Sequence, residues 1–346
     1  MDVKLRAMHC RLLIPDLFPP DPAFAEHLGE RRFPHLETLI ARGRHGCDAW
    51  QSVEQWLLEA FSVARQQDWP SAPFALLGDG GTPGEDFWLH AEPVHLRADR
   101  DRLVIADSTL LDISMEEAQA LAQSVNSHFE PDLHLEPARA NRWYARLSAP
   151  PGQPTVPLSA ILGRSLEPGS AAIGWHAIMN EIQMLLHEHA VNEAREARGA
   201  PAINGVWLWG GGRLAEIKAP PQRAVLSQHP LALGLASHAG VRGSYPPEDV
   251  ARWLERGEPE GVHLVVLDAL SVPARHRDLE RWSLEVQALE RRWLAPLFEA
   301  LQRGRIGMVS MHLGSESQVL NTETTRSDLR HFWQLRKALG HYCCAA

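Results

Sequence analysis

The sequence predicts an α/β protein with a mostly parallel sheet, helices on both faces of that sheet, and an inserted α+β domain. Short apolar runs alternate with helical patterns at both ends of the chain, an order typical of parallel sheets. Residues 262–267 form an almost unbroken apolar run, as expected of a strand covered on both faces. Between about residues 86 and 165 the pattern changes to hairpin-like strands and one capped helix.

The N-terminal part predicts a short buried strand followed by two helices. The strand is expected at 12–14, and a helix over 34–43 ends at a glycine. From Ser52 to about residue 64, apolar residues recur at helical spacing. The stretch 68–85 is rich in proline and glycine, and we expect a domain boundary within it.

The middle of the chain predicts a separate α+β domain over 85–165, inserted into a discontinuous domain formed by 1–84 and 166–346. Strands at 95–97 and 101–107 resemble a hairpin, and Ser114-Met-Glu-Glu is a capping box that begins a helix reaching about residue 127. Residues 150–154 are rich in proline and predict a linker. The later elements expected are a helix at 175–198, strands at 206–209 and 262–267, a helix at 279–301 and a strand at 306–310.

Composition favours a soluble, cytoplasmic protein. The chain has 346 residues, 22% of them charged, and a net charge of −9, which argues against nucleic-acid and anionic-membrane partners. The many arginines leave room for a local basic patch. No apolar run approaches the roughly 20 residues of a membrane span, and four cysteines do not make a disulfide framework in a chain of this length.

The most informative stretch is Asn-Gly-Val-Trp-Leu-Trp-Gly-Gly-Gly-Arg at 204–213, together with the helix-like run at 179–192. The two resemble a helix and a strand of the archaeal-type, cofactor-independent phosphoglycerate mutases, a family of the alkaline phosphatase superfamily. The stretches 34–43, 107–120 and 262–268 resemble the same family, so that the resemblance covers nearly the whole chain. The sequence resembles a divergent bacterial subfamily of this family still more closely. That subfamily is known as a regulatory protein of pathogenicity factors.

The resemblance implies an alkaline phosphatase-like fold and a site with two divalent metals, Mn or Mg, held by carboxylates and imidazoles. Asp16 and Asp268 match strand-end aspartates of that site. His312 matches the histidine of an Asp-His pair. The histidine that normally follows the second aspartate after four residues is displaced to His276. For Asp16, capping a turn is the alternative to a role as metal ligand, and the ligand roles of Asp268 and His276 stay open.

Several ligands that the family supplies are replaced in this sequence. The aspartate beside His312 has become Met311, and Leu320 and Asn321 stand where a further histidine is expected. Methionine and leucine do not bind hard divalent ions. The scaffold therefore resembles the family more closely than the metal site does.

Ser52 is the candidate catalytic nucleophile that the resemblance implies. A helix N-terminus is a favourable place for a phosphate, because free backbone N–H groups point toward it. Ser52-Val-Glu-Gln is also a capping box, and Val53 stands where the family has an aspartate. The sequence alone leaves both interpretations of Ser52 open.

The candidate substrate-binding residues are His90, Arg97, Trp207 and Trp209. His90 lies in the segment aligned with the family's substrate-binding residues, but Glu92 beside it would repel a phosphorylated acid. Arg97 is a nearby cation, with a solvated hairpin face as its alternative. Trp207 and Trp209 are two positions apart on one strand and therefore share a face. Either they line a pocket there, or they fill the core.

Three hypotheses follow from these residues. The first is a degenerate phosphoglycerate mutase-like protein, a pseudoenzyme with a regulatory role that binds a small phosphorylated metabolite or a protein. The second is an active metal-dependent phosphomutase or phosphatase with a rearranged metal site. The third is an interaction protein without a ligand pocket. We expect no confidently assigned cofactor under the first hypothesis, and Mn or Mg under the second.

Overall fold

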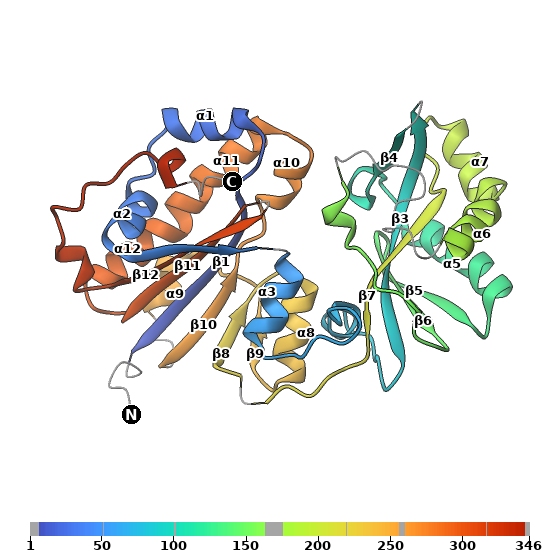
Figure 1. Cartoon of the computed structure of the whole chain (residues 1–346), viewed down its shortest axis with the longest axis horizontal. Coiled ribbons are helices and arrows are strands. Elements are labelled where there is room, and N and C mark those ends of the chain that lie inside the picture. Colours follow the sequence, from blue (N-terminus) through green and yellow to red (C-terminus); the bar gives the residue numbers. More distant parts are fainter. Residues whose placement is uncertain are drawn as a thin grey trace. The chain divides into compact units, whose positions relative to one another are not determined.

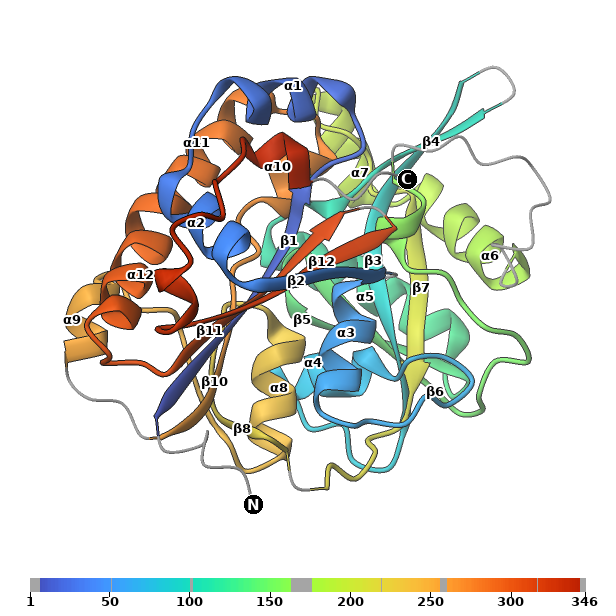
Figure 2. The same cartoon turned by 60° about the vertical axis from the view of Figure 1, so that its left-hand side comes forward.

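Figure 1 and Figure 2 show the computed structural model of the chain, which describes residues 7–50, 52–99, 102–162, 176–218, 220–255, 260–315 and 317–342. The chain divides into two compact units. Unit 1 comprises Met1–Leu57 and Ala219–Ala346, and unit 2 comprises Leu58–Lys218. Over the described residues, no helix combines the length and the apolar character that crossing a membrane requires.

Unit 1 is built on a sheet that contains, within the described residues, seven strands in the order β2-β12-β11-β1-β10-β8-β9. The strands are β1 (Met8–Phe18), β2 (Arg44–Ala49), β8 (Gln222–Leu226), β9 (Arg242–Ser244), β10 (Gly261–Val266), β11 (Met308–Ser315) and β12 (Gln318–Thr325). The run from β11 to β9 is parallel, whereas β12 and β2 join antiparallel at one edge. The prediction of a mostly parallel sheet is therefore confirmed, and β12 extends it beyond the last strand that we expected.

Helices lie on both faces of this sheet (Figure 2). The helical elements of unit 1 are α1 (Pro22–Glu30), α2 (Pro34–Arg42), α8 (Pro230–His238), α9 (Val250–Glu255), α10 (Ser271–Arg275), α11 (Leu279–Leu289), the π-helical turn η5 (Glu290–Leu294), α12 (Ala295–Gln302), and the short turns η6 (Asp328–Arg330) and η7 (Leu339–Tyr342). Cys10, Leu12 and Ile14 of β1 share one core with α2, α11 and α12. Since strand side chains alternate between faces, His9 and Arg11 lie on the opposite face of the sheet.

The helix predicted at 279–301 is three consecutive helical segments rather than one regular helix. α11 continues into the π-helical turn η5, and α12 begins at Ala295 with Pro296 in its first turn. Proline has no backbone N–H to donate to the preceding turn, which accounts for the local change of hydrogen-bond register.

Unit 2 holds a second, antiparallel sheet. Its strands in the described residues are β3 (Phe87–Asp99), β4 (Arg102–Ala106), β5 (Leu133–Arg139), β6 (Arg142–Leu147) and β7 (Gly205–Gly212). Its helical elements are α4 (Ser71–Gly78), η2 (Ser108–Leu110), α5 (Met115–Phe129), η3 (Leu158–Ala160), α6 (His176–His187) and α7 (Ala190–Ala197). The helix α3 (Val53–Ala60) begins in unit 1 and crosses the division between the units.

The structure divides the chain at other positions than the predicted 84/85 and 165/166. β7 pairs with β3 from Gly205 to Gly212, so that the chain returns to unit 1 only after Lys218. The stretch 68–85 contains the buried helix α4, which contacts β3 and β7. The predicted boundary at residue 165 lies outside the described residues.

The two ends of unit 2 are joined to each other. Gln66 Nε2 donates to the Arg213 carbonyl at 2.8 Å, and the Arg213 amide donates to Gln66 Oε1 at 3.1 Å. The backbone therefore arrives in unit 2 and leaves it at neighbouring positions, as expected for an inserted domain.

The helix predicted at 175–198 is divided into α6 and α7; Trp175 lies outside the described residues. His189 occupies the N-cap position of α7, and its Nδ1 accepts a hydrogen bond from the Val191 amide at 3.1 Å. A capping side chain satisfies a backbone N–H that a new helix would leave unpaired. The break therefore has a local cause at His189.

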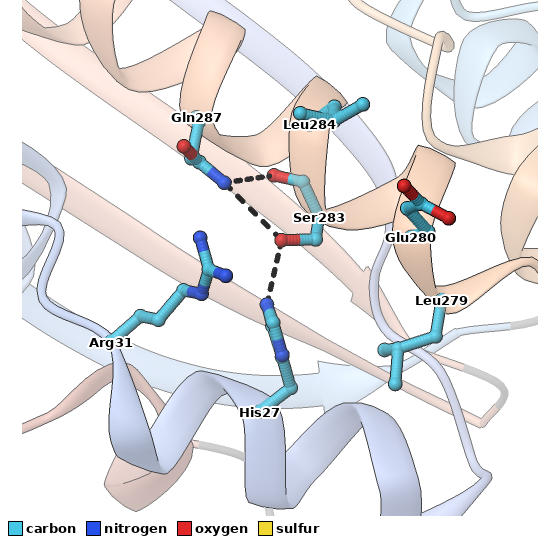
Figure 3. Close-up of a pocket in the computed structure, with 7 residues that line it drawn as sticks. All are labelled: His27, Arg31, Leu279, Glu280, Ser283, Leu284 and Gln287. Carbon is cyan, nitrogen blue, oxygen red and sulfur yellow. Dashed lines mark hydrogen bonds between the residues drawn. The ribbon is translucent and has the colours of Figure 1, made fainter.

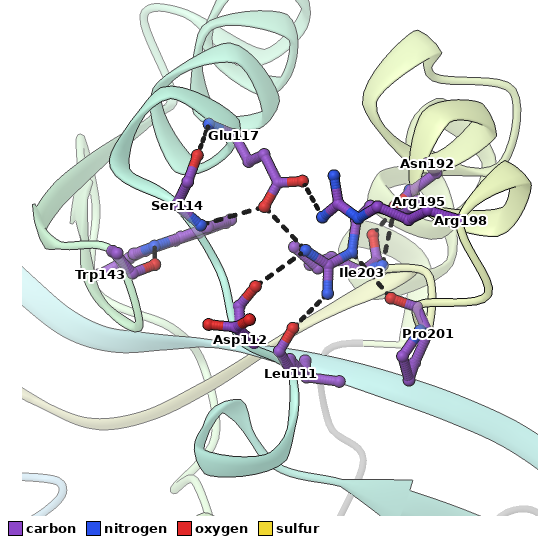
Figure 4. A network of polar contacts seen from close by, with 11 residues as sticks. Leu111, Asp112, Ser114, Glu117, Trp143, Asn192, Arg195, Arg198, Pro201 and Ile203 are labelled. Atoms are coloured by element: carbon purple, nitrogen blue, oxygen red, sulfur yellow. Dashed lines mark hydrogen bonds and ion pairs between the residues drawn. The ribbon is translucent and has the colours of Figure 1, made fainter.

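A buried arginine connects α7 to the start of α5 (Figure 4). Arg195 is fully buried and pairs with Glu117 at 2.7 Å. It also donates to the carbonyls of Leu111, Asp112 and Pro201. Glu117 belongs to the predicted capping box, in which Ser114 and Glu117 exchange hydrogen bonds with each other's backbone N–H. The box is confirmed, and α5 runs from Met115 to Phe129.

Candidate functional site

Asp16 and Asp268 lie on adjacent parallel strands or just beyond them. Asp16 adopts a left-handed conformation with φ of 58° near the end of β1, where the pairing with β11 is interrupted between Ile14 and Phe18. Asp268 follows β10, and its carbonyl accepts from the Ser271 amide at 3.0 Å. Because β1 and β10 pair directly, both aspartates are at the carboxyl edge of the sheet, where ligands of open α/β sheets bind.

The carboxyl group of Asp16 is partly buried and contacts Ser271 of α10. Burial raises its pKa, while a hydrogen bond from Ser271 and the charge of Arg275 oppose that rise. The backbone carbonyl of Asp16 accepts from Trp282 Nε1 at 3.0 Å. Asp16 is therefore held by protein groups on its side chain and on its backbone.

His276 ends α10 at the C-cap position. Its backbone N–H donates to carbonyls within the helix, among them that of Val272. The loop of eight residues from Asp268 is thus taken up largely by one helical turn. Pro273 lies inside α10 and is buried.

His312 lies on β11 in register with Leu13 of β1. Asp16 is three residues further along β1, which corresponds to about 10 Å along a regular strand. Arg11 Nε donates to His312 Nε2 at 2.9 Å. Since an arginine N–H can only donate, Nε2 carries no proton, and the proton is on Nδ1.

The Nδ1–H of His312 then donates to Asn321 Oδ1 at 2.6 Å, and Asn321 Nδ2 donates to Asp48 Oδ2 at 2.6 Å. These contacts form a directional chain from Arg11 on β1 to Asp48 on β2, across β11 and β12. Both ring nitrogens of His312 are engaged in it. A metal ion at His312 would therefore have to displace either Arg11 or Asn321.

The surroundings of this hydrogen-bond chain favour the neutral forms of His312 and His9. Burial lowers the pKa of His312 to about 4, and the positive charge of Arg11 acts in the same direction. Burial and Arg11 likewise lower the pKa of His9, which bonds Ser310 at 2.8 Å. The guanidinium of Arg11 lies over the ring of Trp56, 4.7 Å from its centroid, and that ring also contacts His312.

Ser52 caps α3. Its Oγ accepts from the Gln55 amide at 3.1 Å, which is the contact expected of the capping interpretation. Trp56 stands on the first turn of the same helix, so that α3 connects Ser52 to the Arg11–His312 pair. The hydrogen bond from Gln55 leaves the hydroxyl proton of Ser52 available, and the nucleophile interpretation stays a prediction.

The residues do not form a fitting donor set for two divalent ions. Throughout the part of the chain that the structure describes, no three His, Cys, Asp or Glu side chains cluster as metal ligands. Hard ions need converging oxygen or nitrogen donors, whereas the guanidinium of Arg11 stands directly at His312. Met311 is fully buried on the core side. We derive no metal-dependent step from these residues.

In unit 2, His90 and Trp209 stack on neighbouring strands with ring centroids 4.2 Å apart. His90 Nε2 bonds Ser71 Oγ at 3.1 Å, and Trp209 Nε1 donates to Glu92 Oε1 at 2.6 Å. Glu92 therefore accepts from an indole of its own unit. Trp209 and His90 are 6% and 8% exposed, so this cluster is packed.

Trp207 and Arg97 lie in different environments. Trp207 is 2% exposed, belongs to the same small core as Trp209, and donates to the Val156 carbonyl. The shared face of the two tryptophans thus packs into the core. Arg97 is exposed on β3 opposite β4. The roles of these residues in substrate binding stay predictions.

The glycines at 210–212 are required by packing. A Cβ on Gly210, which has φ of 67°, would collide with Ser71 Oγ, and one on Gly212 would collide with Pro70. β7 therefore approaches α4 more closely than any larger residue allows. This close packing explains why glycines occupy these positions.

A pocket in unit 1 lies between α1 and α11 (Figure 3), where His27 Nε2 and Ser283 Oγ are 2.6 Å apart. Arg31 and Gln287 also line it. It contains none of the site residues predicted from the sequence.

Arg11 and Trp56 are the residues that the sequence analysis missed as part of the site. The available signal was a charged residue within the apolar run 10–14 of a strand that is otherwise buried. Asn321 was noted only as the replacement of a histidine, whereas the structure places it in the hydrogen-bond chain with His312.

Comparisons with known proteins establish the fold and no more. No family model matches the sequence, and no curated protein matches it. The PH0037 protein from Pyrococcus horikoshii is similar over 92% of this chain and 87% of its own, with a TM-score of 0.57 and 14% identity. A cofactor-independent phosphoglycerate mutase from Thermoplasma acidophilum aligns over 99% of this chain and 95% of its own, with 15% identity and a TM-score of 0.47. The first alignment shows that the α/β fold is shared over nearly the whole chain.

Proposed function

We propose that this chain is a degenerate phosphoglycerate mutase-like protein of the alkaline phosphatase superfamily, a pseudoenzyme that binds a small phosphorylated metabolite in a regulatory role. The single observation that supports the proposal is the contact between Arg11 and His312. At the position where the resemblance implies a metal ligand, the imidazole accepts from a guanidinium. A fixed positive charge thus stands where a divalent ion would be repelled.

Arg11 also supplies a reason to expect an anionic ligand. Among the described residues it has no carboxylate within ion-pair distance, and its Nε contact to His312 leaves the two terminal nitrogens for other acceptors. Burial lowers the pKa of this guanidinium, which means that the charge is partly desolvated. A planar guanidinium binds phosphate or carboxylate oxygens in a bidentate manner.

The alternative function is a metal-dependent phosphomutase or phosphatase. The observation in its favour is the proximity of Asp16 and Asp268 at the carboxyl edge of β1 and β10, with Ser271 in contact with both residues. In that case Mn or Mg would be held there without His312. The metal, the cytoplasmic location and the bacterial regulatory role remain proposals.

Two measurements, of bound metal and of ligand-dependent stability, separate the two functions. The protein, freed of metal, is dialysed against millimolar Mn²⁺ and its bound metal is measured, and its melting temperature is recorded with 3-phosphoglycerate in EDTA. We expect no stoichiometric Mn²⁺ and a ligand-dependent stabilisation, which reaches about 2.7 kcal/mol at a hundredfold excess over Kd. Arg11→Gln should abolish that stabilisation, whereas the exposed Arg44→Gln control, taken from the ion pair with Glu323, should preserve it.

Stoichiometric Mn²⁺ that is lost in Asp268→Ala, together with mutase or phosphatase activity, would instead establish the alternative. A stabilisation that survives in Arg11→Gln would contradict the assignment of the ligand to Arg11.

A further inference from the structure

Three large apolar side chains are exposed within four residues near the C-terminus. Phe332 is 73% exposed, Trp333 64% and Leu335 81%. The other large exposed apolar residues of the described chain, such as Met184 and Leu284, are distant from one another in sequence. Isolated exposed apolar residues are ordinary, but a contiguous group of this size marks an interaction surface.

The segment that carries them is attached to the core of unit 1 at both ends. At its start, Asp328 accepts from the Thr325 amide and hydroxyl, and Arg42 Nη1 donates to the Leu329 carbonyl at 2.7 Å. At its end, Leu339 is fully buried and the Lys337 amide donates to the Tyr342 hydroxyl. Figure 1 shows this red segment passing along α2. Phe332, Trp333 and Leu335 therefore project from an anchored loop.

The loop is cationic in a chain whose net charge is −9. Between residues 326 and 342 there are four basic residues, Arg326, Arg330, Arg336 and Lys337, and a single acidic one. That acidic residue, Asp328, is occupied by its contacts with Thr325.

We propose that residues 330–337 form an attachment loop for an anionic phospholipid surface. Aromatic and aliphatic side chains that insert between headgroups, flanked by arginine and lysine, are the combination that peripheral membrane proteins use. The three apolar side chains expose roughly 400 Å² together, taking ~150–250 Å² per large side chain. That is about half of the ~800 Å² per partner in a standard protein–protein interface. At a membrane, electrostatic attraction to anionic lipids adds to the contribution of the buried apolar area.

The overall negative charge does not oppose this contact. Exposed charges further apart than the Debye length, about 8 Å at physiological salt, are largely screened from each other. The local charges of the loop therefore dominate its approach to a membrane, and each basic residue near an anionic surface adds to the attraction. The protein would lie on the membrane and would not span it.

The test is co-sedimentation of the full chain with vesicles of phosphatidylcholine alone and of phosphatidylcholine with 30% phosphatidylserine. We expect binding to the anionic vesicles at least tenfold stronger than to the neutral ones, falling as salt is raised. The double variant Phe332→Ala/Trp333→Ala should lose binding, and Arg336→Gln/Lys337→Gln should weaken it and reduce its salt dependence. Leu284→Ala and Arg303→Gln are matched controls, because both residues are exposed on other elements of unit 1.

We expect the variants to fold, because all four substituted loop positions point away from the core. Circular dichroism melts check this. Absence of binding to anionic vesicles, or binding unchanged in the aromatic double variant, would overturn the proposal. Self-association of the wild type that the same variant abolishes would show that the occupant is a second copy of the chain. Preferential binding of single-stranded RNA that depends on Trp333 would overturn it in favour of nucleic acid.

Discussion

His312 changes its role from an expected ligand to a neutral hydrogen-bond relay. Its acceptor Nε2 faces Arg11, and its donor Nδ1–H faces Asn321. Protonation of the ring would place an N–H against another N–H, next to a positive charge. The hydrogen-bond chain therefore persists only while the imidazole is neutral.

The stability of the protein should consequently depend on pH in the acidic range. The ordinary pKa of 6.5 falls to about 4 in the folded protein, so the folded state binds this proton less readily than the unfolded state does. The stabilisation is complete above pH 6.5 and is lost as the pH falls toward 4. We expect a loss of about 2 to 3 kcal/mol of unfolding free energy from this group.

Urea unfolding at pH 7, 5.5 and 4.5 measures this loss. His312→Gln should reduce the slope of the unfolding free energy against pH. His45→Gln, an exposed substitution on β2, is the control and should leave the slope unchanged. An identical pH dependence in wild type and His312→Gln would contradict the role assigned to the ring.

The candidate site could be predicted only in part from the sequence, because its decisive contacts are long-range. The position of Asp16 at the end of the first strand followed from the local pattern, and so did the capping contact of Ser52. The pairing of Arg11 with His312 joins residues 301 positions apart. It depends on the adjacency of β1 and β11, which no local pattern encodes.

At the scale of secondary-structure elements, α5 and α7 are held together through one carboxylate. Glu117 closes the capping box of α5 and accepts from the buried Arg195 and from Arg198, which is half exposed. Removal of Arg195 would leave three carbonyls without this donor, and Glu117 would keep only Arg198 and the Ser114 amide as donors. Removal of Arg198 would break only a solvated ion pair.

Arg195→Met should therefore destabilise unit 2 by roughly 3 to 5 kcal/mol, whereas Arg198→Met should cost about 1 kcal/mol or less. Both variants lose one positive charge and the same ionic partner, so their difference measures the combined effect of burial and of the three carbonyl contacts made by Arg195. Denaturant unfolding followed by far-ultraviolet circular dichroism measures it. Equal losses in the two variants would show that the buried network contributes little.

Elements with local signals were predicted well. α2 and α5 lie where the sequence predicted them, because a glycine ends the first and a capping box begins the second. The helices α6 and α7 were merged, because histidine is not a usual N-cap residue and His189 gave no recognisable stop. α4 was mistaken for a boundary because proline and glycine surround its apolar turns.

At the scale of the whole molecule, unit 2 is a continuous stretch with a core of its own. Its main cluster joins β3, β5, β6 and β7 to α5 and α6. A single stretch of about 160 residues is long enough to bury an independent core. The predicted insertion at 85–165 was shorter, because it omitted β7, which completes the sheet through pairing with β3.

Residues 58–218 expressed alone should therefore fold. We expect a dispersed amide spectrum by NMR and a single cooperative transition in urea. The segment 85–165, which lacks α4, α6, α7 and β7, should remain unfolded in the same assays and serves as the comparison. A molten or aggregated 58–218 fragment would show that unit 2 depends on the rest of the chain.

The paired hydrogen bonds between Gln66 and Arg213 have a consequence for protein engineering. The two ends of the segment between Gln66 and Arg213 are already neighbours. This segment can therefore be removed without stretching the backbone of unit 1, and a linker of a few glycine and serine residues should replace it. Conversely, the excised piece could be transplanted into a surface turn of an unrelated host.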